Sequence, residues 1–193
     1  MTVAQLLAAL ASPNPTPGGG TAAAIAGAMG TSLLVMVTGL AKSRNNLDDE
    51  KAALAKARAA LEPIASKLME LADADTQSFD AVMAAYRLPK ASDDEKAART
   101  RAIQAALRGA TEIPLETLRV CVAAIAPGRV VRDCGNQSAE SDAGVAIGLL
   151  KAAADGAAAN VRINLTGLKD EAFKNATDAE TSRLAAAADE YLR

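Results

Sequence analysis

The spacing of apolar and polar residues predicts a chain built from helices. A short helix is expected from Thr2 to Leu10, where Thr2 and Gln5 are spaced as a capping box. The next segment, Thr21 to Leu40, is apolar on every side and carries no charge, which is typical of a helix that is buried all round. The pattern therefore places a core helix near the start of the chain.

A long amphipathic helix is expected next. It begins near Asp48, where three consecutive acidic side chains suit the positive end of a helix dipole. It must end before Pro89, and Pro63 is expected to kink it. This helix carries the most informative polar residue of the sequence, which is described below.

Three further helices complete the predicted fold. Their expected ranges are Ser92 to about Ile125, with a kink near Pro114; Ser141 or Asp142 to about Asp155; and about Glu171 to Leu192. Only the short segments GRVVRD and NVRIN are candidate strands. The sequence lacks internal repeats and any alternation of strands with helices. It therefore predicts an all-α fold, a single domain over residues 1–193 in the form of a bundle of about six helices.

Composition narrows the possible functions. Half of the residues are hydrophobic but only 2% are aromatic, so the core must be built from alanine and the aliphatic side chains. A net charge of −2 and the lack of a basic stretch argue against a nucleic-acid partner. The sequence contains no histidine, which excludes histidine-dependent triads and histidine metal sites, and no metal is expected.

The two cysteines indicate a reducing compartment. Cys121 and Cys134 do not form a CxxC motif, and we interpret them as free thiols rather than as a disulfide. The first 41 residues carry no charged side chain, so the positive start of a secretory signal is missing. A cytoplasmic location is expected.

The segment from Thr21 to Leu40 is long enough to span a bilayer, and Lys42 and Arg44 flank it. Its small residues argue against a membrane helix, since alanine, glycine and threonine recur at four-residue spacing and let other helices approach closely. No second segment resembles a span. We therefore expect a soluble core helix and no membrane association.

Three glycines precede this helix in the segment PTPGGGTAAA. Gly18, Gly20 and Ala23 match the spacing GxGxxA, but the preceding SPNPTP cannot be the apolar strand that a dinucleotide-binding turn requires. Gly20 is followed by TAAA rather than by the lysine of a phosphate loop. Two hypotheses remain. The glycines either form a tightly packed turn, with the positive φ and close approach that glycine permits, or they present free N–H groups to an anion or polar ring.

Asp75 interrupts an apolar stripe of the long helix. Leu54, Leu61, Leu68 and Val82 recur at seven-residue spacing, and position 75 belongs to the same series. Asp73 and Asp80 project elsewhere. Because burying an unpaired charge is costly, Asp75 needs either a structural partner, such as an arginine or a helix end, or a functional role.

A second polar cluster is the segment RDCGNQSAESDAGVA, residues 132–146. Ser141 and Asp142 stand where they can cap the following helix. The alternative is that this loop turns its amide and carboxylate groups toward a polar heterocycle.

Four separated motifs resemble the cyclodeaminase/cyclohydrolase family of tetrahydrofolate enzymes. In chain order they are PTPGGGTAAA, ADADTQSFDAVMAAYRLPK, GNQSAESDAGVA and NVRINL. The resemblance covers nearly the whole chain and implies a helical homodimer that acts on a tetrahydrofolate derivative. Members fused to a formiminotransferase cyclise 5-formiminotetrahydrofolate to 5,10-methenyltetrahydrofolate and release ammonia. Stand-alone members are associated with hydrolysis of the methenyl form to 10-formyltetrahydrofolate.

The resemblance also implies site residues. Asp75, Asp142 and Lys42 are implied as catalytic. The implied substrate-binding residues are Pro17, Gly18, Gly19, Gly20, Phe79, Asn136, Ser141 and Asn164. The lysine-rich stretch of the family is AKSRNN here, which keeps Lys42, and the family's Asn-x-Asn is Asn-Gln-Ser.

The implied chemistry requires neither histidine nor a cofactor, because folate itself carries the reacting carbon. A carboxylate can stabilise the cationic substrate and accept a proton, and we expect Asp75 to be the general base while Asp142 positions the pterin. The sequence leaves hydrolase and deaminase activity open, as well as a folate-binding homologue without catalysis.

Overall fold

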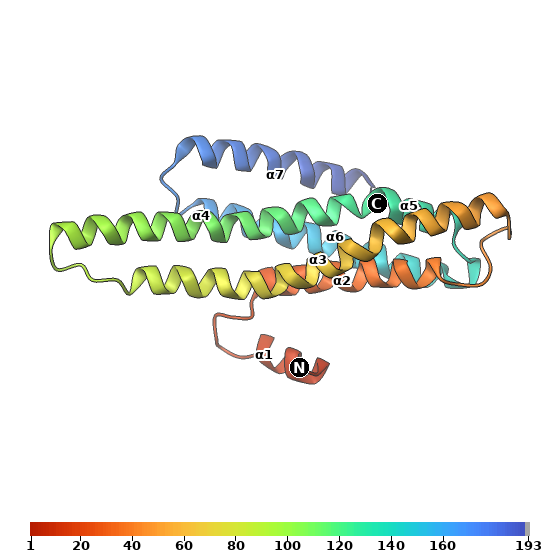
Figure 1. Cartoon of the computed structure of the whole chain (residues 1–193), viewed down its shortest axis with the longest axis horizontal. Helices are drawn as coiled ribbons and strands as arrows, with labels where there is room; N and C mark the ends of the chain where they lie inside the picture. Colours follow the sequence, from red (N-terminus) through yellow and green to blue (C-terminus); the bar gives the residue numbers. More distant parts are fainter. Residues whose placement is uncertain (192–193) are drawn as a thin grey trace.

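The sequence pattern folds as an all-α structure. A computed structural model describes residues 1–191, and within that range every regular element is helical. The elements are α1 (Val3–Leu10), α2 (Gly19–Thr38), α3 (Asp48–Tyr86), α4 (Asp93–Ala123), α5 (Ile125–Cys134), the 3₁₀ turn η1 (Gln137–Ala139), α6 (Glu140–Leu165) and α7 (Glu171–Tyr191). Leu192, the expected end of the last helix, lies outside the described residues. Figure 1 shows the long helices side by side, with α1 standing off the bundle.

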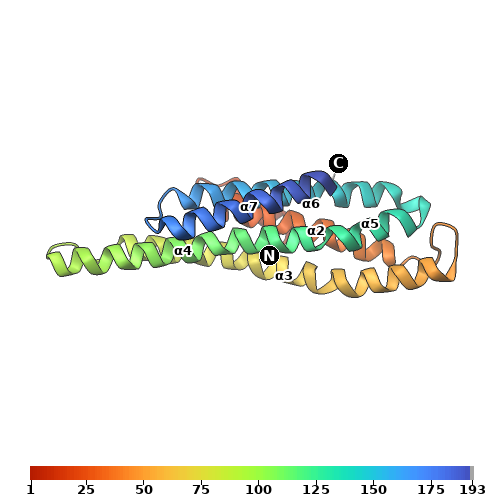
Figure 2. The same cartoon turned by 90° about the horizontal axis from the view of Figure 1, so that it is seen from above.

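Helix α2 is the central element of the bundle. It runs between α3 and α6 (Figure 2) and packs most extensively against these two helices. A Cβ atom at Gly27 would lie 3.1 Å from Cys121 Sγ, and one at Gly30 would lie 2.7 Å from the carbonyl oxygen of Ala146. The small residues therefore allow close helix packing, as the sequence predicted. Among the described residues, α2 is the one helix long and apolar enough to cross a membrane, and 56% of its most apolar stretch is buried inside the protein.

Helices α3 and α4 form a hairpin whose tip extends beyond the other helices (Figure 1). The predicted capping box at the start of α4 is present, since Ser92 Oγ accepts from the Glu95 N–H and the Glu95 carboxylate accepts from the Ser92 N–H. Both helices continue through an internal proline, Pro63 in α3 and Pro114 in α4. The apolar series of α3 is buried as expected; its members are Leu54, Leu61, Leu68 and Val82.

The two candidate strands are helical instead. GRVVRD forms most of α5, a separate helix that the pattern did not predict, and NVRIN forms the end of α6. Val131 and Val161 are almost completely buried, so tertiary packing of one helical face outweighs the β-propensity of these short segments. Helix α6 therefore continues to Leu165, well beyond the predicted end at Asp155.

Two local predictions were also wrong. The N-cap residue of α6 is Ala139, so Ser141 and Asp142 lie in the first turn of the helix and do not cap it. No glycine among the described residues has a positive φ, so the glycine turn does not depend on left-handed backbone. Close approach, the other property that glycine offers, is used at Gly20, as described below.

Both cysteines are free thiols. Cys121 faces Gly27 in the core, and burial raises the pKa of its thiol to about 12, which keeps it protonated and unreactive. The interpretation of the cysteines as unpaired is confirmed.

Candidate active site

A cavity of about 280 Å³ opens where the glycine turn enters α2. It is lined by Pro15, Thr16, Gly18, Gly19, Gly20, Asp75, Ser78, Phe79, Val82, Leu107, Ala110, Asn160 and Asn164. These residues come from the turn, the C-terminal third of α3, the middle of α4 and the end of α6. Six of the predicted site residues therefore meet here, and Pro17 lines a neighbouring cavity beneath α1.

Asp75 is the charged group of this cavity. Its side chain is half-buried, and Thr21 Oγ1 donates a hydrogen bond of 2.8 Å to Asp75 Oδ2. No lysine or arginine in residues 1–191 forms an ion pair with it. Of the two structural partners considered from the sequence, the arginine is missing among the described residues, whereas a helix end is present: the carboxylate lies against Gly20 and Thr21 in the first turn of α2. Asp73 and Asp80 are exposed, as the helical phase predicted.

The glycines place backbone where side chains would block the cavity. A Cβ atom at Gly20 would overlap both the Asp75 carboxylate and Asn160 Nδ2. A Cβ atom at Gly19 would meet no protein atom within 4 Å, although Gly19 lines the same cavity. Position 20 must therefore be glycine to accommodate the Asp75 and Asn160 side chains, whereas the space beside Gly19 is open to a bound molecule.

The first turn of α2 also presents unpaired donors. The first helical hydrogen bond runs from the Ala22 N–H to the Gly18 carbonyl oxygen, so the N–H groups of Gly19 to Thr21 have no partner within the helix. These donors stand at the positive end of the helix dipole, beside the cavity.

Two asparagines of α6 form a polar wall of the cavity, across from the glycine turn. Asn160 and Asn164 are four residues apart and lie on one face of the helix. Asn164 Nδ2 donates 2.8 Å to the carbonyl oxygen of Ala110 in α4. The family resemblance implied Asn164 and did not include Asn160, and because NVRIN was considered as a strand, the helical face that the two asparagines share was not recognised. The four-residue spacing of the two asparagines was the signal that could have found it.

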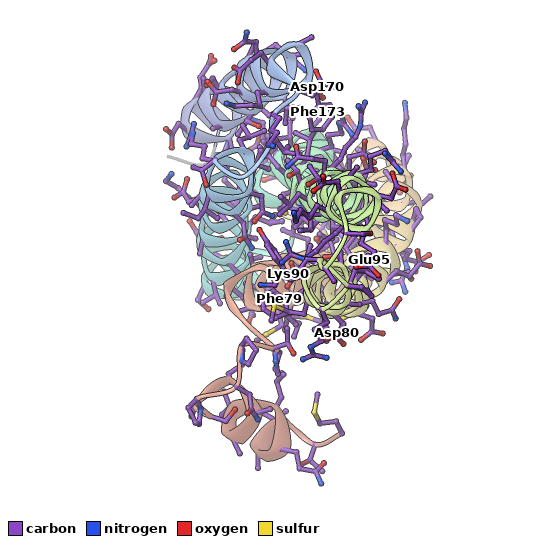
Figure 3. All side chains as sticks on the ribbon, turned by 90° about the vertical axis from the view of Figure 1, so that its left-hand side faces the viewer. Phe79, Asp80, Lys90, Glu95, Asp170 and Phe173 are labelled. Atoms are coloured by element: carbon purple, nitrogen blue, oxygen red, sulfur yellow. The ribbon has the colours of Figure 1, made fainter. Side chains whose placement is uncertain are left out.

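Apolar side chains complete the cavity. Phe79 and Val82 from α3 and Leu107 from α4 line it. Figure 3 views the bundle from this end and places Phe79 between α3 and the start of α2, while Asp80 points outward. The cavity thus combines an aromatic ring, aliphatic walls, two amides and one carboxylate, which is suited to a flat, hydrogen-bonding ring.

The other predicted residues lie at the far end of the bundle. Helix α6 runs antiparallel to α2, so Ala146 packs on Gly30 and Asn160 on Gly20. Asp142 and Asn164 therefore stand at opposite ends of one 26-residue helix, roughly 30 Å apart at 1.5 Å per residue. Within one chain the structure does not bring this second group to the cavity. The group consists of Lys42, Asn136, Ser141 and Asp142.

Backbone and carboxylate hydrogen bonds hold the loop at the far end. The Arg44 N–H donates 2.8 Å to the Cys134 carbonyl oxygen, which ties the loop to α5. Glu50 accepts from Ser43 Oγ at 2.7 Å, from the Asn45 N–H at 2.9 Å and from the Asn45 amide. These bonds, the Ser43 hydroxyl above all, lower the pKa of Glu50 to about 2. The Glu50 carboxylate therefore has a structural role, since its hydrogen bonds hold the loop that carries Lys42.

Comparison with known proteins identifies the family. The sequence matches the family described as Formiminotransferase-cyclodeaminase over residues 2–183, a range that includes every candidate site residue. The chain belongs to the formiminotransferase-cyclodeaminase family. This confirms the resemblance drawn from the four sequence motifs.

Relatives within the formiminotransferase-cyclodeaminase family include two kinds of named enzyme. The chain is 44% identical over 172 residues to a methenyltetrahydrofolate cyclohydrolase of Methylorubrum extorquens, covering 89% of this chain and 83% of that protein. It is 35% identical to a formimidoyltransferase-cyclodeaminase of Rattus norvegicus, and the match spans 32% of that longer protein. A solved structure of formiminotetrahydrofolate cyclodeaminase from Thermotoga maritima superposes with a TM-score of 0.86 at 27% identity, over 100% of this chain and 92% of that one.

Proposed function

We propose that this protein hydrolyses 5,10-methenyltetrahydrofolate to 10-formyltetrahydrofolate. The observation that carries the proposal is the Asp75 carboxylate, which faces a ring-sized cavity and has no cation partner among the described residues. The methenyl substrate supplies the missing positive charge. The match to the Methylorubrum extorquens cyclohydrolase over most of both chains favours this reaction of the two that the family's names describe.

In the proposed mechanism, the pterin lies against Phe79 between Gly19 and the α6 asparagines. Water attacks the methenyl carbon, and Asp75 accepts a proton from that water as the carbon–oxygen bond forms. The tetrahedral carbon then breaks its bond to N5, which takes the proton held by Asp75, and the hydroxyl on that carbon loses its proton as the C=O bond of the N10-formyl group forms. One proton is released overall. Asp75 stabilises the cationic substrate before attack, so its negative charge acts in both steps.

The reaction as proposed requires no metal and no organic cofactor, because the folate is both substrate and carbon carrier. We further propose that it takes place in the cytoplasm, which the free thiols of Cys121 and Cys134 support.

The direct test is to mix the purified protein with methenyltetrahydrofolate and to follow the loss of its near-ultraviolet absorbance. Rapid loss that depends on protein concentration is expected. Unchanged absorbance with tight binding would favour a non-catalytic folate-binding protein, and would contradict the proposal.

The second candidate reaction is cyclodeamination of 5-formiminotetrahydrofolate to the methenyl form with loss of ammonia. The name of the Thermotoga maritima structural neighbour favours it. Ammonia release from 5-formiminotetrahydrofolate, faster than hydrolysis of the methenyl form, would select this reaction instead.

We also propose a two-fold homodimer in which the partner completes each site. The cavity and the group of Lys42, Asn136, Ser141 and Asp142 lie at opposite ends of one chain. A two-fold axis perpendicular to α2 exchanges the ends of that helix, and so sets the second group of one copy beside the cavity of the other.

Exposed apolar side chains offer a surface for this contact. Met29 and Met36 of α2, Met69 of α3 and Val145 of α6 are between 41% and 56% exposed. Helix α1 has no buried residue and stands off the bundle (Figure 1), as an arm that packs on a second copy would. Met29 and Met69 line one shallow hollow, and exposed apolar side chains that lie together in this way are typical of an association surface.

Mixing two impaired variants, assayed at a substrate concentration well below KM, tests the shared site. If Asp75 and Asp142 of different copies act together, a mixture of D75N and D142N dimers that exchange subunits recovers about a quarter of wild-type activity, because one site in each heterodimer is intact. A mixture without recovery, or a stable monomer at micromolar concentration in sedimentation, would contradict the shared site.

A further inference from the structure

We propose that Pro114 is a positioning residue that turns the Asn164 amide oxygen into the cavity as a hydrogen-bond acceptor. Pro114 does so by withholding a backbone donor from Ala110. This inference rests on the proposed function, since it names how the same site selects the edge of its substrate ring.

The first step is the unpaired carbonyl of Ala110. In an α-helix, the N–H of each residue bonds to the carbonyl oxygen four residues earlier, and proline has no N–H. Pro114 lies inside α4, so the carbonyl oxygen of Ala110 has no helical partner. Ala110 is only 8% exposed and Pro114 is buried, so this carbonyl must find a donor within the protein.

The second step concerns the hydrogen-bond donor to the Ala110 carbonyl oxygen. Asn164 Nδ2 reaches across from α6 and donates to the Ala110 oxygen at 2.8 Å. If the Asn164 amide were flipped, its oxygen would face the Ala110 carbonyl oxygen, and the two acceptors would repel each other. The missing proline N–H therefore determines which way round the Asn164 amide stands.

The third step concerns Asn164 Oδ1, the amide oxygen that is not used in the bond to Ala110. Asn164 is half-buried and lines the cavity, and no group in residues 1–191 donates to its Oδ1. With Nδ2 held at the Ala110 carbonyl, the oxygen is the end of the Asn164 amide that is left without a partner, and it offers the cavity an acceptor. At this point of the wall Asn164 therefore favours a ring edge that carries N–H or amino hydrogens, as the amide edge of a pterin does, over an edge that carries only a carbonyl.

A second proline in the same chain provides the contrast. Pro63 lies inside α3 and deprives Ala59 of its helical donor in the same way. Ala59 and Pro63 are both exposed, so water can reach that carbonyl, and no side chain in the described range donates to it. Pro63→Ala is thus a matched control for Pro114→Ala, with the same chemical change and no cavity beside it.

The first experiment measures the coupling between Pro114 and Asn164 without reference to activity. N164L leaves the Ala110 carbonyl unpaired, and the melting temperature is expected to fall by about 4 °C. In the P114A background the restored N–H bonds to Ala110, so the same N164L change is expected to cost almost nothing. In the P63A background the full loss should persist. Equal losses in all three backgrounds would overturn the proposal.

The second experiment measures substrate recognition. In P114A the backbone competes for Ala110 and frees the Asn164 amide to turn, so KM for methenyltetrahydrofolate should rise about tenfold while kcat changes little. P63A should keep the wild-type KM. Coupling in the first experiment with an unchanged KM in P114A would overturn the acceptor role. A wild-type protein that neither binds nor converts folate would defeat the proposed function, and the stability coupling would still decide the Pro114–Asn164 pairing.

Discussion

Two carboxylates on α3 show how differently one helix can use the same chemical group. Glu50, at the start of α3, is buried and accepts hydrogen bonds from Ser43 and Asn45. Asp75, in the C-terminal third of α3, is half-buried and accepts one hydrogen bond from Thr21. Glu50 is therefore satisfied by its own loop, whereas Asp75 keeps acceptor capacity that faces a cavity. The difference separates a structural carboxylate from one that is available to a substrate.

The largest effect is expected from Asp75→Asn. The change removes the proposed base and keeps the side-chain shape, so turnover of methenyltetrahydrofolate should fall at least about a hundredfold. Folding should survive, with equal or higher stability, because a half-buried charge without a cation partner is removed. Steady-state kinetics and thermal melting check both. Asp73→Asn, an exposed change two positions before Asp75 on the same helix, is the matched control and should keep wild-type activity. Near-normal turnover in D75N would remove Asp75 from the mechanism.

The next largest effect is expected at the two glycines. Gly19→Val places a side chain in the space that the protein leaves open, so folding should be normal while folate affinity falls by more than about tenfold. Gly20→Ala forces a Cβ into Asp75 and Asn160, so it should lower stability as well as affinity.

Binding titrations and melting curves on both glycine variants distinguish the two roles. Gly109→Val, at an exposed glycine of α4 with open space around it, serves as the control. Normal folate binding by G19V would reduce the glycine turn to a structural role.

A smaller, different effect is expected from Asp142→Asn. Asp142 lies in the first turn of α6, where a negative charge is favoured by the helix dipole, and we assign it to positioning the pterin of the partner's site. KM should rise several-fold to about tenfold while kcat changes less. Glu140→Gln, in the same turn and exposed, is the control. If D142N abolished turnover and D75N did not, the roles of the two carboxylates would be exchanged.

The smallest effect is expected from Glu50→Gln, and it concerns stability. The pKa of Glu50 is lowered from 4.5 to about 2 by its hydrogen bonds, so its ionised form stabilises the folded state above about pH 4.5. This contribution is lost as pH falls from about 4.5 to about 2. The wild-type melting temperature should therefore drop across that window more than that of E50Q. Glu62→Gln, which breaks an exposed ion pair with Arg58, should leave the wild-type pH dependence intact.

Local pattern was enough for most of the helices and for Asp75. Capping boxes, proline positions and the seven-residue series depend on neighbours within a few turns, so the starts of α1 and α4 and the cavity-facing phase of position 75 follow from sequence. The errors arose at GRVVRD and NVRIN, where short β-branched segments looked extended. Their valines became helical because burial against α2 and its neighbours decided the conformation.

The sequence by itself determined which residues can carry chemistry here: a chain without histidine, a carboxylate on an apolar stripe, and glycines at the start of an uncharged helix. Only the tertiary structure decided how they combine. The antiparallel packing of α6 on α2 brings Asn160 to Gly20 and carries Asp142 to the opposite end, and the crossing of α6 with α4 sets Asn164 against the carbonyl that Pro114 leaves unpaired. The pattern within one helix determines the face on which a side chain lies. The relative orientation of two packed helices determines which residues that side chain contacts, and this orientation depends on the whole buried surface.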